Sequence, residues 1–308
     1  MLSFAGISLV FVEFIPGHPK RSLNVAKKRI PMFVPGYGKS YALLSGTDGV
    51  DTVVIFVHGF GGKPTSTWRN FHGLVDEYAM DYSWWPKSDM YFYAYESLHT
   101  PIRRNAELLG GFVDVVLSRS LGDPPADNLK YKNLVFAGHS EGGVIIRRLI
   151  LDRYEATKTA AQKKTNRKIN ATVRKDEIER MVKAEPVLSS YLRLFAPACM
   201  GTNFSSWAGF LTSWSHLVSA LTASSLVRNE LLSGSPILKT LQTGTELAHE
   251  EFPEVQSLYT RPLFGVPDQI VYSDSYKGEE LLWDDGYDHF GVCKPNHAHK
   301  RPLEFVKV

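Results

Sequence analysis

The stretch Leu134-Val135-Phe136-Ala137-Gly138-His139-Ser140-Glu141-Gly142-Gly143-Val144-Ile145 joins two elements of different kinds. Its first four residues are typical of a strand buried on both faces, and Gly142 to Leu151 has the apolar content of a helix. Between them lies the pentapeptide G-x-S-x-G. A chain that reverses so sharply from strand to helix holds its serine in a strained backbone conformation with the hydroxyl projecting, and glycines avoid collisions in the turn. The sequence therefore predicts Ser140 as a nucleophile.

A second strand ends in a glycine-rich loop upstream of this turn. Val53 to Val57 is an unbroken apolar run that stops at His58-Gly59-Phe60-Gly61-Gly62. Acyl transfer places negative charge on a carbonyl oxygen, which backbone N–H groups can stabilise. We expect an oxyanion hole formed by the N–H groups of Phe60 and Glu141.

A serine hydroxyl also needs a general base, and the base in turn needs an acid. His289 follows the last predicted strand, where the chain order Ser, acid, His puts the base. Two acids compete for the third place. Asp268 lies 21 residues before His289, in Gly265-Val266-Pro267-Asp268, where a strand should end. Asp274 is the alternative if residues 269–273 form the strand instead.

The remaining histidines and nearby acids receive other interpretations. We expect His58 and His139 to be structural, and Asp284, Asp285 and Asp288 to be solvated or supporting charges. His297 and His299 form a His-x-His pair, but no carboxylate or cysteine cluster accompanies it, so no metal site is predicted. Only Cys199 and Cys293 occur, too few for a disulfide framework.

The order of the elements predicts an α/β fold with a mainly parallel sheet. Beyond the segments above, we expect strands at Ile7 to Phe14, Tyr91 to Tyr95, Tyr191 to Ala196, Arg261 to Gly265 and Glu280 to Trp283, and a helix at Ile102 to Leu117. Strands that alternate with helices favour right-handed crossover connections. We interpret residues 1–308 as one domain.

Two insertions interrupt this pattern, at about residues 156–186 and 203–250. Residues 156–175 contain seven Lys or Arg and no acid, which favours either a solvated segment or peripheral contact with an anionic membrane. In the second insertion large side chains recur at helical spacing, which fits either a lid over an acyl pocket or a helix packed on the core. They are Trp207, Phe210, Leu211, Trp214, Leu217, Val218 and Leu221.

Composition excludes several classes of protein. The 308 residues are 44% hydrophobic and 22% charged with a formal net charge of +3, which is ordinary for a globular protein and too mild for a nucleic-acid binder. No apolar run reaches the roughly 18 residues that span a bilayer. The apolar start lacks a basic n-region, so no signal peptide is recognised and a cytoplasmic location is expected.

Taken together, the motifs resemble the lipase and esterase branch of the α/β-hydrolase superfamily. The resemblance rests on residues 55–62 with Thr67-Trp68, on Gly138 to Gly143, and on Asp288-His289 leading to Cys293-Lys294-Pro295. It implies a carboxylester hydrolase with Ser140, Asp268 and His289 as its triad, a small-molecule ester or lipid ester as substrate, and no cofactor. Glu141 departs from the family, where Met, Leu or Gln often follows the serine. The short interval between acid and base departs from it too.

Three alternatives remain at this point. The same triad could serve an acyltransferase or a thioesterase, and a hydrolase fold can also be a catalytically silent binding module.

Overall fold

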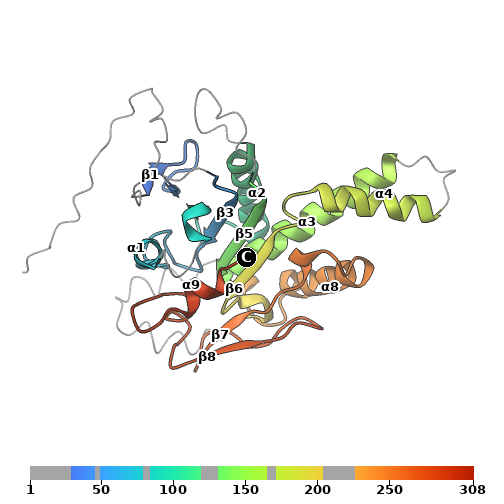
Figure 1. Cartoon of the computed structure of the whole chain (residues 1–308). Coiled ribbons are helices and arrows are strands. Elements are labelled where there is room, and N and C mark those ends of the chain that lie inside the picture. The colour runs from blue at the N-terminus through green and yellow to red at the C-terminus, as the bar shows by residue number, and fades with distance from the viewer. Residues whose placement is uncertain (1–28, 46–48, 79–83, 119–130, 165–170, 204–225) are drawn as a thin grey trace, which may run out of the picture.

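A computed structural model describes residues 29–45, 49–78, 84–118, 131–164, 171–203 and 226–308 (Figure 1). An eight-stranded sheet runs through the middle of the molecule in the order β1-β2-β4-β3-β5-β6-β7-β8. Its strands are β1 (Ile30–Phe33), β2 (Tyr41–Leu44), β3 (Thr52–Val57), β4 (Ser88–Tyr93), β5 (Asn133–His139), β6 (Tyr191–Phe195), β7 (Leu263–Val266) and β8 (Leu282–Asp285).

Six of these strands, β4-β3-β5-β6-β7-β8, run parallel, and β2 is antiparallel to both β1 and β4. The predicted α/β fold with a mainly parallel sheet is therefore confirmed. Parallel strands end at a common edge, where ligands of such sheets usually bind. The register pairs Val57 with Gly138 and His139 with Phe195, so the loops after β3, β5 and β6 start side by side.

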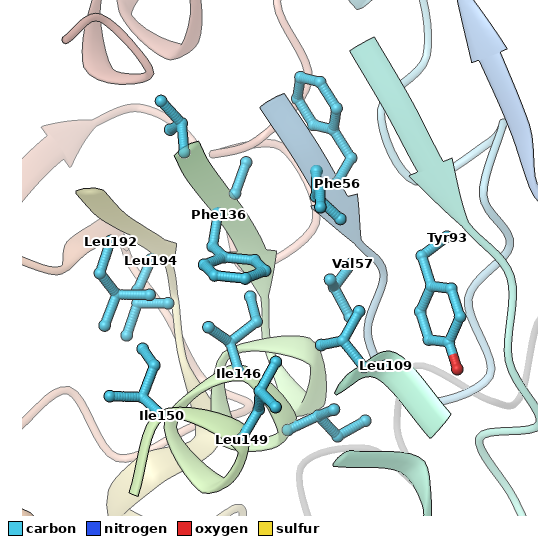
Figure 2. Close-up of a cluster of buried hydrophobic side chains, with 14 of the residues drawn as sticks. Phe56, Val57, Tyr93, Leu109, Phe136, Ile146, Leu149, Ile150, Leu192 and Leu194 are labelled. Carbon is cyan, nitrogen blue, oxygen red and sulfur yellow. The ribbon is translucent and has the colours of Figure 1, made fainter. Parts of the chain in front are cut away.

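Helices cover both faces of the sheet. Phe56 of β3 packs against Phe71 of α1 (Phe71–Glu77), and Phe195 packs against Phe305 of α9 (Arg301–Phe305), with ring centroids 4.9 Å apart in both pairs. On the opposite face lie α2 (Ile102–Ser118) and α3 (Glu141–Lys164). Because successive strand residues point to opposite faces, Val57 points toward this second layer. In Figure 2 Val57 and Phe136 lie against Leu109 of α2 and Ile146 of α3.

The helix after the serine is longer than predicted, because α3 continues past Leu151 to Lys164. A second helix, α4 (Ala171–Ala184), packs on its far end, and the two project from the body as a helical hairpin (Figure 1). Ala161 of α3 is buried, as are Ile178 and Val182 of α4. Alanine and lysine have high helix propensity, so this composition extends the helix once a partner covers its apolar side.

The basic residues of the segment 156–175 lie partly on this hairpin, and acidic side chains elsewhere pair with some of them. Lys158 pairs with Glu251, and Lys164 lies 3.7 Å from Glu177. Peripheral membrane contact through this run stays a prediction. No helix in the part of the chain that the structure describes is long and apolar enough to cross a bilayer.

The second insertion contains α7 (Leu226–Glu230) and α8 (Pro236–Glu251). Ser235 caps α8 by accepting a hydrogen bond from the Leu238 N–H, and α8 buries Leu238 and Leu241 as it packs on α3. This part is therefore a helix packed on the body of the protein. The aromatic residues expected to form a lid or a packed face, Trp207 to Leu221, lie outside the described residues. The strand expected at Ile7 to Phe14 lies outside them too.

The remaining elements among the described residues are three short 3₁₀ turns, η1 (Trp85–Lys87), η2 (Ala198–Met200) and η3 (Gln256–Leu258). The strand predicted at Tyr91 to Tyr95 is shifted toward the N-terminus, because β4 pairs with β3 from Ser88 onward. β7 ends at Val266, and residues 269–273 form no strand, only one isolated bridge from Val271 to Thr202.

A buried ion pair joins the middle of α3 to the segment between β7 and β8. Arg147 Nη2 lies 2.6 Å from Glu279 Oε1, and both side chains are 2% exposed. Glu279 also accepts hydrogen bonds from the N–H groups of Thr260 and Tyr276. Burial is the largest single influence and opposes the charge on Arg147, but Glu279 together with Cys199 and Tyr276 outweighs it, so the pKa of the guanidinium is raised. The pair therefore holds the segment that follows Asp268 against the helix that follows Ser140.

Replacing Glu279 by alanine should lower the free energy of unfolding by about 3–5 kcal/mol, because it leaves the Arg147 charge buried and uncompensated. Urea unfolding followed by circular dichroism measures this. Lys277→Ala is the matched control, since its pair with Glu250 is exposed at both ends and should contribute no more than about 1 kcal/mol. Equal losses in the two variants would show that the buried pair does not stabilise the fold.

Candidate active site

Ser140 sits at the sharp turn between β5 and α3, as predicted. Its φ is +54°, in the left-handed region that residues with a Cβ rarely adopt. Hydrogen bonds fix the turn: the Ser140 N–H donates to the Phe195 carbonyl, and the Ser140 carbonyl accepts from Gly143 and Ala198. The strain therefore persists because the surrounding backbone determines it.

Glycines make this turn sterically feasible. A Cβ on Gly138 would lie 2.6 Å from Ile146 Cδ1, and one on Gly142 would lie 2.3 Å from the Val57 carbonyl oxygen. The Cβ on Gly138 would also lie 3.0 Å from Cα and N of Gly143, and these backbone atoms, like the Val57 carbonyl, cannot shift as the tip of a side chain can. The steric reason for glycine at these two positions, inferred from the motif, is confirmed.

His289 and Asp268 form a buried pair on the neighbouring loops. His289 Nδ1 lies 3.0 Å from Asp268 Oδ2, and the two side chains are 1% and 0% exposed. The other oxygen, Oδ1, accepts from the N–H groups of Ile270 and Val271. The carboxylate is thus fixed from both sides. Asp274 is exposed, and its Oδ1 accepts from the adjacent Ser275 N–H.

The second nitrogen of His289, Nε2, is buried without a hydrogen-bond partner among the described residues. His289 nonetheless lies at the serine turn. Its carbonyl accepts a hydrogen bond of 2.8 Å from Nε2 of His139, the residue before Ser140, and the two rings lie 4.8 Å apart. Hydrogen bonds between a base and its nucleophile are often long in a free enzyme and tighten when substrate binds.

The loop after β3 packs directly on the serine. A Cβ on Gly59 would lie 2.7 Å from Ser140 Cβ, so only glycine allows this approach. The loop closes with a hydrogen bond of 2.9 Å from the Gly62 N–H to the Gly59 carbonyl. Phe60 follows Gly59 in this turn. Glu141 is the first residue of α3, so its N–H has no acceptor within the helix. The two predicted oxyanion donors thus belong to segments that flank the serine.

His58 and His139 have partners that fit structural roles. Burial lowers the pKa of His58 to about 4, and its Nδ1 lies 3.0 Å from the Gly59 carbonyl. Burial, and next the charge of His289, lowers the pKa of His139 well below its usual value. Both rings are therefore neutral near pH 7.

The His-x-His pair does not converge on one point. His299 Nε2 lies 2.7 Å from Asp284 Oδ2, and its ring stacks on Tyr287, whereas exposed His297 lies near Glu77 and Tyr78. In the residues that the structure describes, no three His, Cys, Asp or Glu side chains are grouped as metal ligands. Cys199 and Cys293 are both free and buried.

Sequence reasoning missed Tyr95. Its hydroxyl donates a hydrogen bond of 2.6 Å to the His58 carbonyl, and its ring stacks on the His58 imidazole with centroids 4.2 Å apart. It lies two residues beyond β4, at the same edge of the sheet as the serine. The sequence offered one local indication of a role at the site, which is that this tyrosine lies just past the carboxyl end of a parallel strand.

The strand order, the single antiparallel strand within the sheet and a strained serine between a central strand and its helix identify the architecture. The chain has the α/β-hydrolase fold. By sequence it matches no protein-family model and no curated protein.

Several solved structures are similar to this chain in their fold. Est1E from Butyrivibrio proteoclasticus is 13% identical with a TM-score of 0.43, over 91% of this chain and 96% of that one. Lpx1, a peroxisomal α/β-hydrolase of Saccharomyces cerevisiae, is 9% identical with a TM-score of 0.47, over 86% and 79%. A structure from work on the carboxylesterases of Nitrososphaera gargenis is 10% identical with a TM-score of 0.43, over 89% and 94%.

Proposed function

We propose that this protein is a serine hydrolase that cleaves a carboxylester through an acyl-enzyme intermediate. One observation carries the proposal: a serine at positive φ on a strand-to-helix turn lies beside a buried histidine whose Nδ1 is hydrogen-bonded to a buried aspartate. This combination meets the needs of nucleophilic acyl transfer.

In this proposal His289 Nε2 accepts the proton of the Ser140 hydroxyl as the oxygen attacks the acyl carbon. Asp268 holds the proton on Nδ1, which leaves Nε2 free to accept, and stabilises the imidazolium that forms. The N–H groups of Phe60 and Glu141 donate to the oxyanion. His289 then protonates the leaving alcohol. In the second half of the reaction His289 takes a proton from water as the water attacks the acyl-enzyme, and it returns a proton to Ser140 as the acid product leaves.

Burial strengthens each of these interactions. Ser140 is 3% exposed and His289 1%, so charge develops away from bulk water. Fixed N–H groups stabilise an anion more effectively in such a setting than in water, and they need no reorganisation. The proposed substrate is a small-molecule ester.

The test combines turnover with covalent labelling of the wild-type protein. We expect hydrolysis of p-nitrophenyl butyrate, and a fluorophosphonate adduct that mass spectrometry of the digested protein assigns to Ser140. Absence of both would favour a silent binding module. Ester formation with an added alcohol at millimolar concentration, at the expense of free acid, would favour an acyltransferase. Turnover of butyryl-CoA well above that of the ester would favour a thioesterase.

A further inference from the structure

Tyr95 and the first turn of α3 hold the His58 carbonyl between them. The Tyr95 hydroxyl donates to this oxygen at 2.6 Å. From the α3 side, a Cβ on Gly142 would lie 2.5 Å from the same oxygen, so the helix backbone packs against it. His58 is the residue between β3 and the loop that contacts Ser140. The position of its carbonyl therefore determines the positions of Gly59 and Phe60, which follow it in the chain.

The carboxyl group beside this hydroxyl belongs to Glu141. Glu141 is fully buried, and its carboxyl interacts with the Tyr95 hydroxyl, although neither oxygen has a partner at hydrogen-bonding geometry within the described chain. Burial, and next the charge of Glu96, raises the pKa of Glu141 well above its usual value. Burial therefore favours the neutral form of this acid.

Neutrality at Glu141 matters for the direction of the Tyr95 hydrogen bond. A carboxylate is a stronger acceptor than a peptide carbonyl, so an ionised Glu141 would compete for the hydroxyl proton. Burial disfavours that ionised form, which is consistent with the Tyr95 hydroxyl donating to the His58 carbonyl. The burial of Glu141 is thus consistent with the short hydrogen bond from the Tyr95 hydroxyl to the His58 carbonyl.

We propose that Tyr95 is a positioning residue, which holds the His58 carbonyl and thereby sets the Phe60 N–H against Ser140. The inference rests on the proposed function, since it concerns the oxyanion hole of that reaction. The loop has little room to move toward the serine, because Gly59 already lies so close that a Cβ on it would come within 2.7 Å of Ser140 Cβ. A donor displaced by a fraction of an ångström still binds the ground-state ester but stabilises the oxyanion less well.

Tyr95→Phe removes the hydroxyl and keeps the ring that stacks on His58. We expect kcat for p-nitrophenyl butyrate to fall roughly tenfold, less than the ~10²–10³-fold loss that follows removal of an oxyanion donor itself. KM should change little. Inhibition by a trifluoromethyl ketone, whose adduct with Ser140 places an oxyanion in the site, should weaken by the same factor as kcat/KM.

Tyr93→Phe is the matched control. Tyr93 is the last residue of β4, its ring packs on Phe112 and lies 5.8 Å from that of Tyr95, and it loses the same hydroxyl. We expect wild-type kcat and inhibition from this variant. All rates are to be expressed per active site titrated with fluorophosphonate, so that partial misfolding lowers the number of sites and not the rate at each.

Two results would overturn the inference: an unchanged kcat per titrated site in Tyr95→Phe, or equal losses in the two variants. Either can occur while the wild-type enzyme hydrolyses esters and is labelled at Ser140, in which case the proposed function stands. A wild-type protein without turnover or label would overturn the proposed function, and this inference with it.

Discussion

Replacing Ser140 by alanine should lower kcat for p-nitrophenyl butyrate by about 10⁶-fold, the loss typical of a serine hydrolase without its nucleophile. Alanine has no hydroxyl, so no acyl-enzyme forms, and the remaining rate comes from water attacking an ester held at the oxyanion donors. The decisive measurement is burst and steady-state release of p-nitrophenol from equal amounts of wild-type and variant protein. The variant should show neither the burst nor fluorophosphonate labelling.

The fold should survive this substitution. Alanine also carries a Cβ, so the strain at φ +54° is similar before and after, and the backbone hydrogen bonds of the turn are unaffected. We expect the same urea midpoint as the wild type. Ser189→Ala, at an exposed position in the turn before β6, serves as a control that should keep full activity. Retained turnover in Ser140→Ala would remove the basis of the proposed function.

The serine turn could be predicted because its determinants are local. β3 and β5 are continuous apolar runs, and each ends at a glycine-containing loop within a few residues. The steric demand that selects Gly138 and Gly142 also acts within the turn and its nearest strand. A short window of sequence therefore contains the physical reason for the structure.

The acid was harder to predict because it depends on where β7 ends. Residues 269–273 contain apolar side chains that could continue a strand, and the sequence left Asp268 and Asp274 open. Asp268 bonds to the N–H groups of Ile270 and Val271 through its own side chain. Such local bonds replace those of a sheet and turn the chain away from it. Asp268 therefore contributes to ending the extended run that made its own position ambiguous.

Long-range contacts had no counterpart in the sequence pattern. Tyr95 lies 37 residues from the carbonyl it binds, and Arg147 lies 132 residues from Glu279. Neither residue belongs to a motif, since each acts through a partner that only the strand order brings near. The length of α3 was underestimated for a related reason. The helix as a whole is only weakly amphipathic, and its far end packs against α4, where Ala161 is buried.

Asp268→Asn should lower kcat by about 10⁴-fold, through the protonation of His289 and not through loss of shape. Asp268 accepts three hydrogen bonds, two from backbone N–H groups on Oδ1 and one from His289 on Oδ2. An asparagine has one accepting oxygen. If that oxygen keeps the two backbone bonds, its NH₂ group faces Nδ1 of His289, which must then accept. The ring proton moves to Nε2, where it prevents His289 from taking the proton of Ser140.

Asp274→Asn is the matched control, because it makes the same chemical change at the competing acid. Asp274 is exposed, and its Oδ1 accepts a hydrogen bond from the neighbouring Ser275 N–H, so kcat should stay near that of the wild type. The comparison requires kcat at saturating ester, together with the urea midpoint of each variant. A large loss in Asp274→Asn with a small one in Asp268→Asn would reassign the acid. Because His289 Nδ1 already lies 3.0 Å from Asp268, that result would also require the loop after β7 to rearrange before catalysis.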